Sequence, residues 1–354
     1  MTRLEKALAK LAGCDYDALY ISSEINQRYV TEFAFTDGYV LITKEKSYVV
    51  TDFRYIEAAR AKVKGNFEII GERRADTLSS LCAENHVKAL GFEDSSLSYA
   101  GYESLKNQLS GVKLVPAGKF IEELRIFKDK EEVENITKAQ RIAEKAFAET
   151  IPYIKAGVLE TELAAELEYR MRMNGAEDKS FETICISGKA SSSPHGVPRN
   201  VPIEHGFLTF DFGALYNGYH SDMTRTVVVG KADEDMKKLY YTVLNAQMSV
   251  INVIAEGCAN AEMDKIARDI IDGAGYAGCF GHSLGHGVGL EIHEAPGLAS
   301  RAEGTLKVGQ IVTVEPGIYL EGKYGCRIED MVEITPGGSN LITDCPKELL
   351  EIDV

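Results

Sequence analysis

Two aspartates flank a tight turn in the segment LTFDFGALYNGYHSDMTRTVVVG, where two strand-like runs meet at an Asn-Gly pair. Asn-Gly is typical of two-residue hairpin turns, and such a turn predicts Asp211 opposite Thr224 and Asp222 opposite Gly213. The two carboxylates then share one face as diagonal neighbours, roughly 7–8 Å apart at Cα. Inward carboxylates at this spacing repel unless a cation lies between them or one is protonated. The hairpin therefore predicts a metal site, while this segment alone leaves open a local hydrogen bond for Asp222 and a solvent-facing Asp211.

Three histidines, His282, His286 and His293, lie within twelve positions of one another in GHSLGHGVGLEIHE. The glycines between them disfavour a helix and allow close approach of the backbone to a ligand. A single histidine is usually a hydrogen-bonded polar residue, but three beside glycines favour a binding site.

Two further acids, Glu315 in QIVTVEPGIYL and Glu329 in CRIEDMVEI, interrupt stretches that otherwise have the pattern of buried strands. A carboxylate in such a place is unfavourable unless it is paired or binds a metal. With Asp211, Asp222 and His286, these acids make four carboxylates and one imidazole, enough to hold two divalent ions.

The donor types indicate which metal would bind. Oxygen donors with one nitrogen suit Mn²⁺, although Co²⁺ and Zn²⁺ also bind such ligands. The seven cysteines are scattered and contain no CxxC pair. We therefore expect manganese, reduced thiols and no disulfide framework or thiolate metal site.

The composition narrows the class of protein. The 54 acidic and 39 basic residues give a net charge of −15, which argues against nucleic-acid and anionic-membrane binding. A hydrophobic content of 45% excludes disorder as the main state. No stretch approaches the roughly 20 apolar residues of a membrane span, and the charged start MTRLEKALAKLAG lacks a signal-peptide pattern. We expect a cytoplasmic protein.

The chain length predicts two domains, with one large domain as the alternative, since 354 residues exceed twice the roughly 150 of a typical domain. Strand-like runs alternate with helix-like stretches in the first part, which predicts an α/β domain over 1–124. A charged amphipathic stretch over 120–154 predicts a connecting helix that opens the second domain, 125–354. Two further helices are expected over 159–175 and 235–257, each ending in glycine.

Five segments resemble, in order and spacing, the signature of the Xaa-Pro peptidases of the pita-bread metallopeptidase group, namely aminopeptidase P and prolidase. The amino-terminal stretches NQRYVTEF and VVTDFRYIEAA resemble the first domain of the same family, so nearly the whole chain is covered. The resemblance implies an α+β fold with a creatinase/prolidase-type α/β domain followed by a pita-bread catalytic domain. The five segments are SFETICISGKASSSPH, DFGALYNGYHSDMTRT, GHSLGHGVGLEIHE, VEPGIY and RIED.

The resemblance also implies roles for individual residues. The four acids and the imidazole named above fall on the five metal ligands of the family, and His195, His282 and His293 fall on histidines that surround the substrate. Arg327 and Tyr319 fall on residues that support the ligands, and Thr224 is expected to do the same from its place opposite Asp211. The residues expected to take part in catalysis are His195, His282, His293, Glu315 and Arg327; those expected to bind metal are Asp211, Asp222, His286, Glu315 and Glu329.

The implied reaction is metal-dependent hydrolysis of the Xaa-Pro bond at peptide amino termini. Two divalent ions would activate a bridging water as hydroxide and polarise the carbonyl, while a histidine such as His293 stabilises the oxyanion and Glu315 transfers the proton. Prolidases restricted to dipeptides often carry an arginine shortly after the HE pair, suited to clamp a free carboxylate. Here Gly297 stands at about that place and Arg301 follows, so the main expectation is an Xaa-Pro aminopeptidase and the alternative is an Xaa-Pro dipeptidase.

Other functions are less well supported by these residues. Methionine aminopeptidase has the same ligand pattern, but the large amino-terminal domain and the hairpin segment favour the Xaa-Pro type. A non-catalytic pita-bread binding module and creatinase-like amidinohydrolysis both fit poorly with five retained ligands. The expected partners are proline-containing peptides and a second copy of the chain in a homodimer, with no nucleic acid and no membrane.

Overall fold

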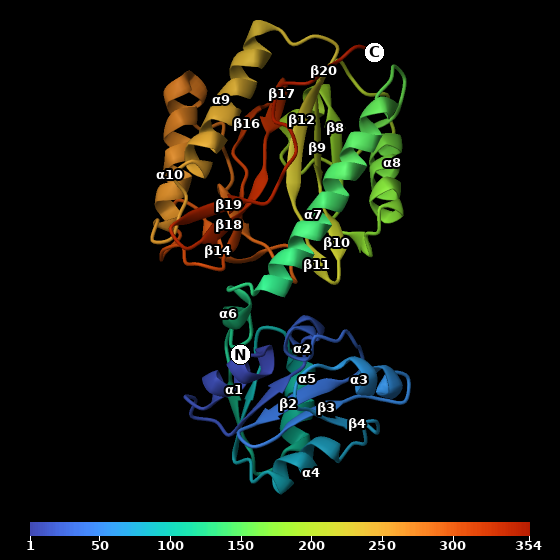
Figure 1. Cartoon of the computed structure of the whole chain (residues 1–354), viewed down its shortest axis with the longest axis vertical. Helices are drawn as coiled ribbons and strands as arrows, with labels where there is room; N and C mark the ends of the chain where they lie inside the picture. Colours follow the sequence, from blue (N-terminus) through green and yellow to red (C-terminus); the bar gives the residue numbers. More distant parts are fainter. The chain divides into compact units, whose positions relative to one another are not determined.

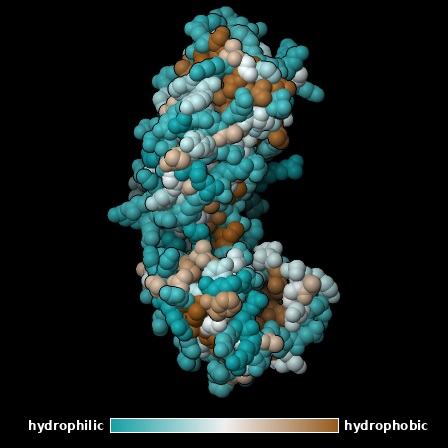
Figure 2. All heavy atoms as spheres, turned by 90° about the vertical axis from the view of Figure 1, so that its right-hand side faces the viewer, coloured by the Kyte–Doolittle hydropathy of each residue, from teal (hydrophilic) through white to brown (hydrophobic).

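The computed structural model describes residues 1–354 and divides the chain into two compact units, Met1–Arg125 and Ile126–Val354 (Figure 1). Its mixed helices and strands confirm the predicted α+β class. No helix has both the length and the apolar character needed to cross a membrane. Figure 2 shows a face that is mostly hydrophilic, with small hydrophobic patches, which agrees with a net charge of −15.

The amino-terminal unit is built on a six-stranded mixed sheet in the order β4-β3-β2-β1-β5-β6. The central strand β1 pairs antiparallel with β2 and parallel with β5. Side chains from the sheet such as Leu41 and Leu90 form a core with Leu78 and Leu105 of two helices. The strands are β1 (Ala18–Ile21), β2 (Tyr39–Thr43), β3 (Ser47–Val50), β4 (Glu68–Ile70), β5 (Ala89–Phe92) and β6 (Lys113–Pro116); the helices are α1 (Arg3–Leu11), α2 (Glu24–Thr31), α3 (Ile56–Lys62), α4 (Thr77–Glu84), α5 (Tyr99–Gln108) and α6 (Glu122–Arg125).

The second unit consists of two halves, each with a pair of helices lying side by side (Figure 1). Helices α7 (Lys130–Thr150) and α8 (Glu160–Met173) cover the four-stranded sheet β20-β12-β9-β8. Helices α9 (Glu234–Ile251) and α10 (Asn260–Ile271) share a second core with strands of the five-stranded sheet β14-β13-β15-β18-β19. The apolar sides of the two sheets therefore face the helices, which leaves their other sides for polar residues.

The strands and short helices of this unit are β7 (Asp178–Lys179), β8 (Ile184–Ser187), β9 (Gly206–Phe212), β10 (Ala214–Tyr216), β11 (Tyr219–His220), β12 (Met223–Val229), β13 (Gly285–Gly287), β14 (Glu294–Leu298), β15 (Ile311–Val314), β16 (Gly317–Leu320), β17 (Tyr324–Arg327), β18 (Asp330–Thr335), β19 (Gly338–Leu341), β20 (Glu351–Ile352), two 3₁₀ turns (Ile151–Tyr153 and Gly188–Ser192) and one π turn (Asp272–Tyr276).

The predicted hairpin register is present. Tyr216 pairs with Tyr219 across the turn, and Asp211 pairs with Thr224 farther along. The Asn and Gly of the turn have φ of 46° and 71°, the left-handed conformation that a type I′ turn requires at both positions. The turn residues therefore set which side chains face each other six residues from the turn on either strand.

Two predicted helix boundaries are wrong. The stretch over 120–154 is not one helix, because α6 ends at Arg125 and α7 begins only at Lys130, where Asp129 forms a capping box. The helix predicted to reach Gly257 ends at Ile251, since two successive backbone N–H groups beyond it, at 253 and 254, bond to the Val250 carbonyl and close the last turn.

Candidate metal centre

The five predicted ligands come from both halves of the second unit. Asp211 lies in β9 and Asp222 directly before β12, whereas His286 lies in β13, Glu315 follows β15 and Glu329 lies between β17 and β18. Segments more than a hundred residues apart therefore contribute to one place in the fold.

The strand period explains why Asp211 faces away from the helices. Its neighbours Phe210 and Phe212 both pack on Phe147 of α7, with ring centroids 5.5 Å apart in each case. Alternate side chains of a strand point to opposite faces. Asp211 and its cross-strand partner Thr224 consequently point to the polar side of the sheet.

Three of the predicted ligands converge closely. One ligand atom from each of Asp222, His286 and Glu329 lies within 4.8 Å of the others. His286 Nε2 is 3.5 Å from Asp222 Oδ2 and 3.4 Å from Glu315 Oε1. Its Nδ1 is 3.0 Å from the Gly287 carbonyl oxygen. An Nδ1–H that donates to this carbonyl leaves the lone pair of Nε2 directed at the carboxylates, as in metal-binding histidines.

Asp211 lies at the side of this group. Its Oδ2 accepts a hydrogen bond from Arg327, while its buried Oδ1 has no hydrogen-bond partner. A buried acceptor without a partner is rare in proteins, and this oxygen is therefore suited to a further positive ligand.

The carboxylates of the cluster raise one another's pKa values. Burial, followed by the negative charges of Glu329 and Asp211, raises the pKa of Asp222 well above its ordinary value. Burial and then the charges of Glu315 and Asp211 do the same for Glu329, and burial raises the pKa of Glu315 to about 8. Burial lowers the pKa of His286 to about 4, so its imidazole is neutral at pH 7 and supplies no compensating charge.

These observations fit a divalent cation centre. Several buried carboxylates without a matching positive charge are unfavourable, and a cation removes that cost by favouring their ionised forms. The unpartnered Oδ1 of Asp211 and the Nε2 of His286, which faces the carboxylates of Asp222 and Glu315, can coordinate such an ion. Carboxylate oxygens with one imidazole form the ligand type that divalent metals of the Mn²⁺ class accept.

Arg327 joins several parts of the site. It is buried, donates from Nη2 to Asp211, and lies with Nη1 2.6 Å from the hydroxyl of Tyr319. Its Nε donates to Thr224 Oγ1 at 3.1 Å, and Nη1 also reaches the carbonyl of Pro194 at 3.2 Å. One planar guanidinium thus fixes four groups from separate segments, which a lysine could not do.

The partners of Arg327 extend this network to a ligand and to a histidine. Thr224 Oγ1 donates to Glu329 Oε2 at 2.7 Å. The hydroxyl of Tyr319 lies 2.9 Å from His282 Nε2. Thr224 thus contacts a predicted ligand, whereas Tyr319 contacts Arg327 and a predicted substrate histidine and no ligand directly.

The three histidines predicted to surround the substrate lie in different environments. His282 is held from both ring nitrogens, by Tyr319 and by the carbonyl of Ser283 at 2.8 Å. Burial, and then the charge of Arg327, lowers its pKa to about 4. His293 is exposed and its ring centroid lies 4.3 Å from that of His286. His195 is exposed on the loop whose Pro194 carbonyl bonds to Arg327.

One further residue of the site, Thr313, was not predicted. Its hydroxyl donates to Glu315 Oε1 at 3.1 Å and accepts the backbone N–H of His286 at 3.0 Å. A signal for it exists in the segment IVTVE, because the period of two in a strand places Thr313 and Glu315 on the same face.

The loop that carries His195 is anchored by a buried carboxylate at the start of α8. Glu160 accepts hydrogen bonds from the backbone N–H and hydroxyl of Ser187, both at 2.7 Å, and from Arg199. Burial raises the pKa of Glu160, but the hydrogen bonds from Arg199 and Ser187 outweigh it and lower the pKa below the usual 4.5.

This anchor predicts acid lability. Because the folded state lowers the pKa of Glu160, its contribution to stability is complete above the unfolded-state pKa and disappears as pH falls through the folded-state pKa. Glu160→Gln is expected to cost about 1–3 kcal/mol of unfolding free energy at pH 7 and to flatten the loss of stability below about pH 4.5. Urea unfolding at pH 7 and pH 4 measures both. Glu182→Gln, at a carboxylate 92% exposed, is the control, and equal effects of the two variants would contradict the assignment.

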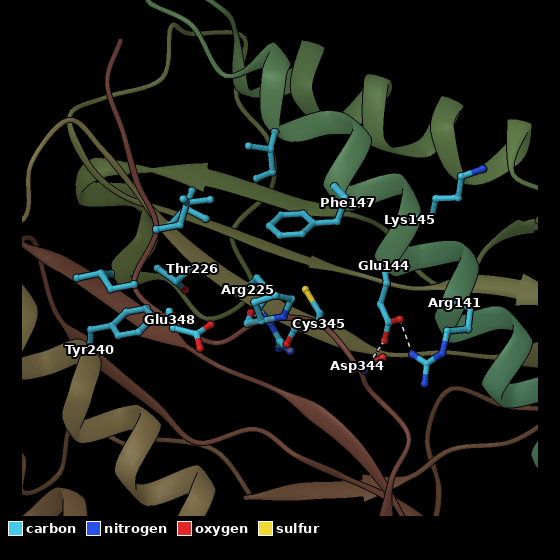
Figure 3. Close-up of a pocket in the computed structure, with 16 residues that line it drawn as sticks. Arg141, Glu144, Lys145, Phe147, Arg225, Thr226, Tyr240, Asp344, Cys345 and Glu348 are labelled. Carbon is cyan, nitrogen blue, oxygen red and sulfur yellow. Dashed lines mark hydrogen bonds and ion pairs between the residues drawn. The ribbon is translucent and has the colours of Figure 1, made fainter.

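A separate cavity of about 630 Å³ lies elsewhere in this unit (Figure 3). Its lining includes Phe147, Val227, Tyr240, Leu349 and the charged Arg225. None of the predicted site residues lines it, so it is distinct from the metal centre.

Family comparisons cover nearly the whole chain. Residues 134–336 match metallopeptidase family M24, and residues 3–127 match the creatinase/prolidase amino-terminal domain. The chain is 42% identical over 355 residues to an uncharacterized peptidase, YqhT, of Bacillus subtilis, covering 98% of this chain and 99% of that one. It is 39% identical over 350 residues to a Pyrococcus furiosus protein named Xaa-Pro dipeptidase, again covering 98% and 99%.

Two solved structures are similar over almost their full length. An Xaa-Pro dipeptidase from Bacillus anthracis has a TM-score of 0.96 and 40% identity, with 99% of each chain covered. An X-Pro aminopeptidase from Thermotoga maritima has a TM-score of 0.92 and 33% identity, with 97% of this chain and 100% of that chain covered.

Proposed function

The chain belongs to metallopeptidase family M24, the group of Xaa-Pro peptidases that its sequence resembles, and from this premise we propose that it is an Xaa-Pro dipeptidase. In the proposed reaction it hydrolyses the peptide bond before proline in dipeptides. Two divalent ions, held by Asp211, Asp222, His286, Glu315 and Glu329, take part.

One observation carries the proposal. The ligand atoms of Asp222, His286 and Glu329 converge within 4.8 Å, with Glu315 3.4 Å from His286 and an unpartnered oxygen on Asp211 beside them. This arrangement leaves buried negative charge that a metal ion would balance.

Each residue of the site has a separate role in the proposed reaction. Divalent ions bound there would supply Lewis-acid activation of water and of the scissile carbonyl. Glu315, next to the reacting groups, accepts a proton from the attacking water and returns it to the proline nitrogen, which leaves as a secondary amine. His293, exposed beside His286, donates to the oxygen that becomes negatively charged. We assign peptide binding to His195, on its exposed loop, and to His282, whose ring is held by Tyr319 and Ser283.

Arg327 acts on this chemistry through its neighbours. Its bond to Asp211 holds one carboxylate in place, and its bonds to Tyr319 and Thr224 set the orientation of His282 and Glu329. Residues that orient metal ligands commonly change activity 10- to 100-fold when replaced.

The choice of dipeptides over longer peptides rests on the relatives. Proteins named Xaa-Pro dipeptidase are 39% identical in sequence and reach a TM-score of 0.96 in structure.

Gly297 favours the second candidate, an Xaa-Pro aminopeptidase, because no arginine stands there to bind a free carboxylate. A Cβ at Gly297 would meet no atom within 4 Å, so the first atom of a side chain fits there, and Gly297→Arg is expected to raise the preference for dipeptides.

We also propose that the metal is manganese, that the protein forms a homodimer and that it is located in the cytoplasm. Manganese fits the oxygen-rich ligand set. The homodimer rests on the resemblance to the family. A cytoplasmic location is supported by reduced, unpaired cysteines.

A comparison of substrate lengths tests the proposal. Manganese-loaded protein is given Ala-Pro, Arg-Pro-Pro or Ala-Ala at equal concentration, and products are separated by chromatography. We expect kcat/KM for Ala-Pro to exceed that for the tripeptide at least about tenfold, with no cleavage of Ala-Ala. A preference for Arg-Pro-Pro would establish the aminopeptidase instead, and cleavage of Ala-Ala alone would contradict both.

A further inference from the structure

A buried ion pair lies outside the predicted metal ligands. Lys128 Nζ is 2.8 Å from Glu294 Oε2, and the two side chains are only 1% and 6% exposed. The backbone N–H of Lys128 also donates to the Gly309 carbonyl at 2.7 Å. Lys128 therefore has its backbone fixed to the body of the second unit while its ammonium group reaches Glu294.

The carboxylate of Glu294 organises the loop that connects β13 to β14. Its Oε1 accepts the backbone N–H of Glu291 at 3.1 Å. The carboxylate also lies against Gly289, where an added Cβ would come within 2.5 Å of Oε2. Glu294 thus bonds to Lys128 on one side and supports the 288–293 loop on the other.

This loop ends at His293, the residue directly before Glu294. Across the strand pair, Glu294 stands opposite Gly287, which follows the ligand His286. The rings of His286 and His293 are 4.3 Å apart. The position of Glu294 therefore affects where His293 is held relative to the metal centre.

We propose that Lys128 is a positioning residue for His293: its ion pair with Glu294 fixes the 288–293 loop and thereby the histidine that meets the substrate. The inference rests on the proposed function for its kinetic consequences and on geometry alone for the order of the loop. It extends the site to a residue that touches neither metal nor substrate.

The charges of Lys128 and Glu294 explain why this pair can hold the 288–293 loop in one position. A buried ion pair adds little net stability compared with apolar side chains of the same volume. It does, however, demand a defined distance and direction, since each charge is costly without its partner. Apolar side chains in these two places would fill the volume without directing a carboxylate at the loop backbone.

The test replaces the pair without leaving a buried charge. Lys128→Met with Glu294→Met removes both charges together, which protects against simple failure to fold. Lys128→Arg is the conservative variant. Lys130→Met is the matched control, because Lys130 is 92% exposed.

Hydrogen–deuterium exchange measures the loop without substrate or activity. We expect exchange of peptides covering 288–293 to accelerate at least about tenfold in the double variant, with other peptides and the Lys130 variant unchanged. Unchanged exchange in this loop would overturn the proposal even if the protein proved to have another function.

Kinetics with Ala-Pro then separate positioning from general support of the fold. At equal manganese content, the kcat of the double variant is expected to fall about 10- to 100-fold, with KM altered less than about threefold. Lys128→Arg is expected to have a higher kcat than the double variant, because it keeps a positive charge opposite Glu294. In a His293→Gln background the same double substitution is expected to add less than about threefold. A full additional loss in that background, or kcat retained at wild-type level, would overturn the positioning role. Absence of Ala-Pro hydrolysis by the unaltered protein would instead refute the proposed function.

Discussion

Asp222→Asn is expected to abolish hydrolysis of Ala-Pro while making the metal-free protein more stable. The carboxylate belongs to the converging group with His286 and Glu329, so its loss removes a proposed ligand and lowers kcat/KM by about a thousandfold or more. Burial and the charges of Glu329 and Asp211 raise its pKa. A group with a raised pKa destabilises the fold when it is ionised, so the neutral amide raises Tm of metal-free protein at pH 8.

Thermal unfolding with and without Mn²⁺, together with metal analysis, measures both effects. The unaltered protein should gain stability on adding Mn²⁺, and the variant should not. Asp353→Asn removes the same charge from a carboxylate 82% exposed and should behave like the unaltered protein. A variant that keeps full manganese content and activity would show that Asp222 is not a ligand.

Arg327→Met is expected to have the second largest effect. It leaves Asp211 without its ion-pair partner and releases Tyr319 and Thr224. Removing one member of a buried ion pair costs about 3–5 kcal/mol of stability, and misplacing the ligands is expected to lower kcat/KM at least 10- to 100-fold. Tm, metal content and Ala-Pro kinetics measure these changes.

Replacing Arg327 with lysine distinguishes the effect of the positive charge from the effect of the guanidinium geometry. Arg327→Lys keeps the positive charge but not the planar fork, so it should recover part of the lost stability and little of the activity. Arg172→Met, at a side chain 58% exposed, is the surface control. Activity within about threefold of normal in Arg327→Met would contradict the network.

Local sequence signals predicted the parts of the site that one segment determines. The Asn-Gly turn specified which residues face each other in the hairpin, because its left-handed conformation permits few alternatives. The glycines around His286 correctly excluded a helix, and the close approach of the backbone at Gly285 and Gly287 explains their presence. The acids at Glu315 and Glu329 stand out in the sequence because they lie in apolar stretches, although the structure places each of them at the end of a buried strand and not within one.

The sequence patterns do not predict which side chains of distant segments contact one another. The family resemblance implies that Arg327 and Tyr319 support the site, but their bonds to Asp211, Pro194 and His282 depend on how the two halves pack. The same holds for Lys128 and Glu294, which are 166 residues apart. Helix ends also differ from the prediction, because α6 ends at Arg125 and the cap at Asp129 begins a new helix within an amphipathic pattern that continues on both sides.

The most direct test of metal-dependent Xaa-Pro hydrolysis is to remove metal from the protein and follow Ala-Pro hydrolysis as Mn²⁺ is returned, with binding measured by calorimetry in the same samples. We expect no hydrolysis without metal, activity that rises with bound Mn²⁺, and no cleavage of a methionyl peptide that lacks proline. Metal-independent cleavage of Ala-Pro, or no cleavage after Mn²⁺ has bound, would contradict this expectation.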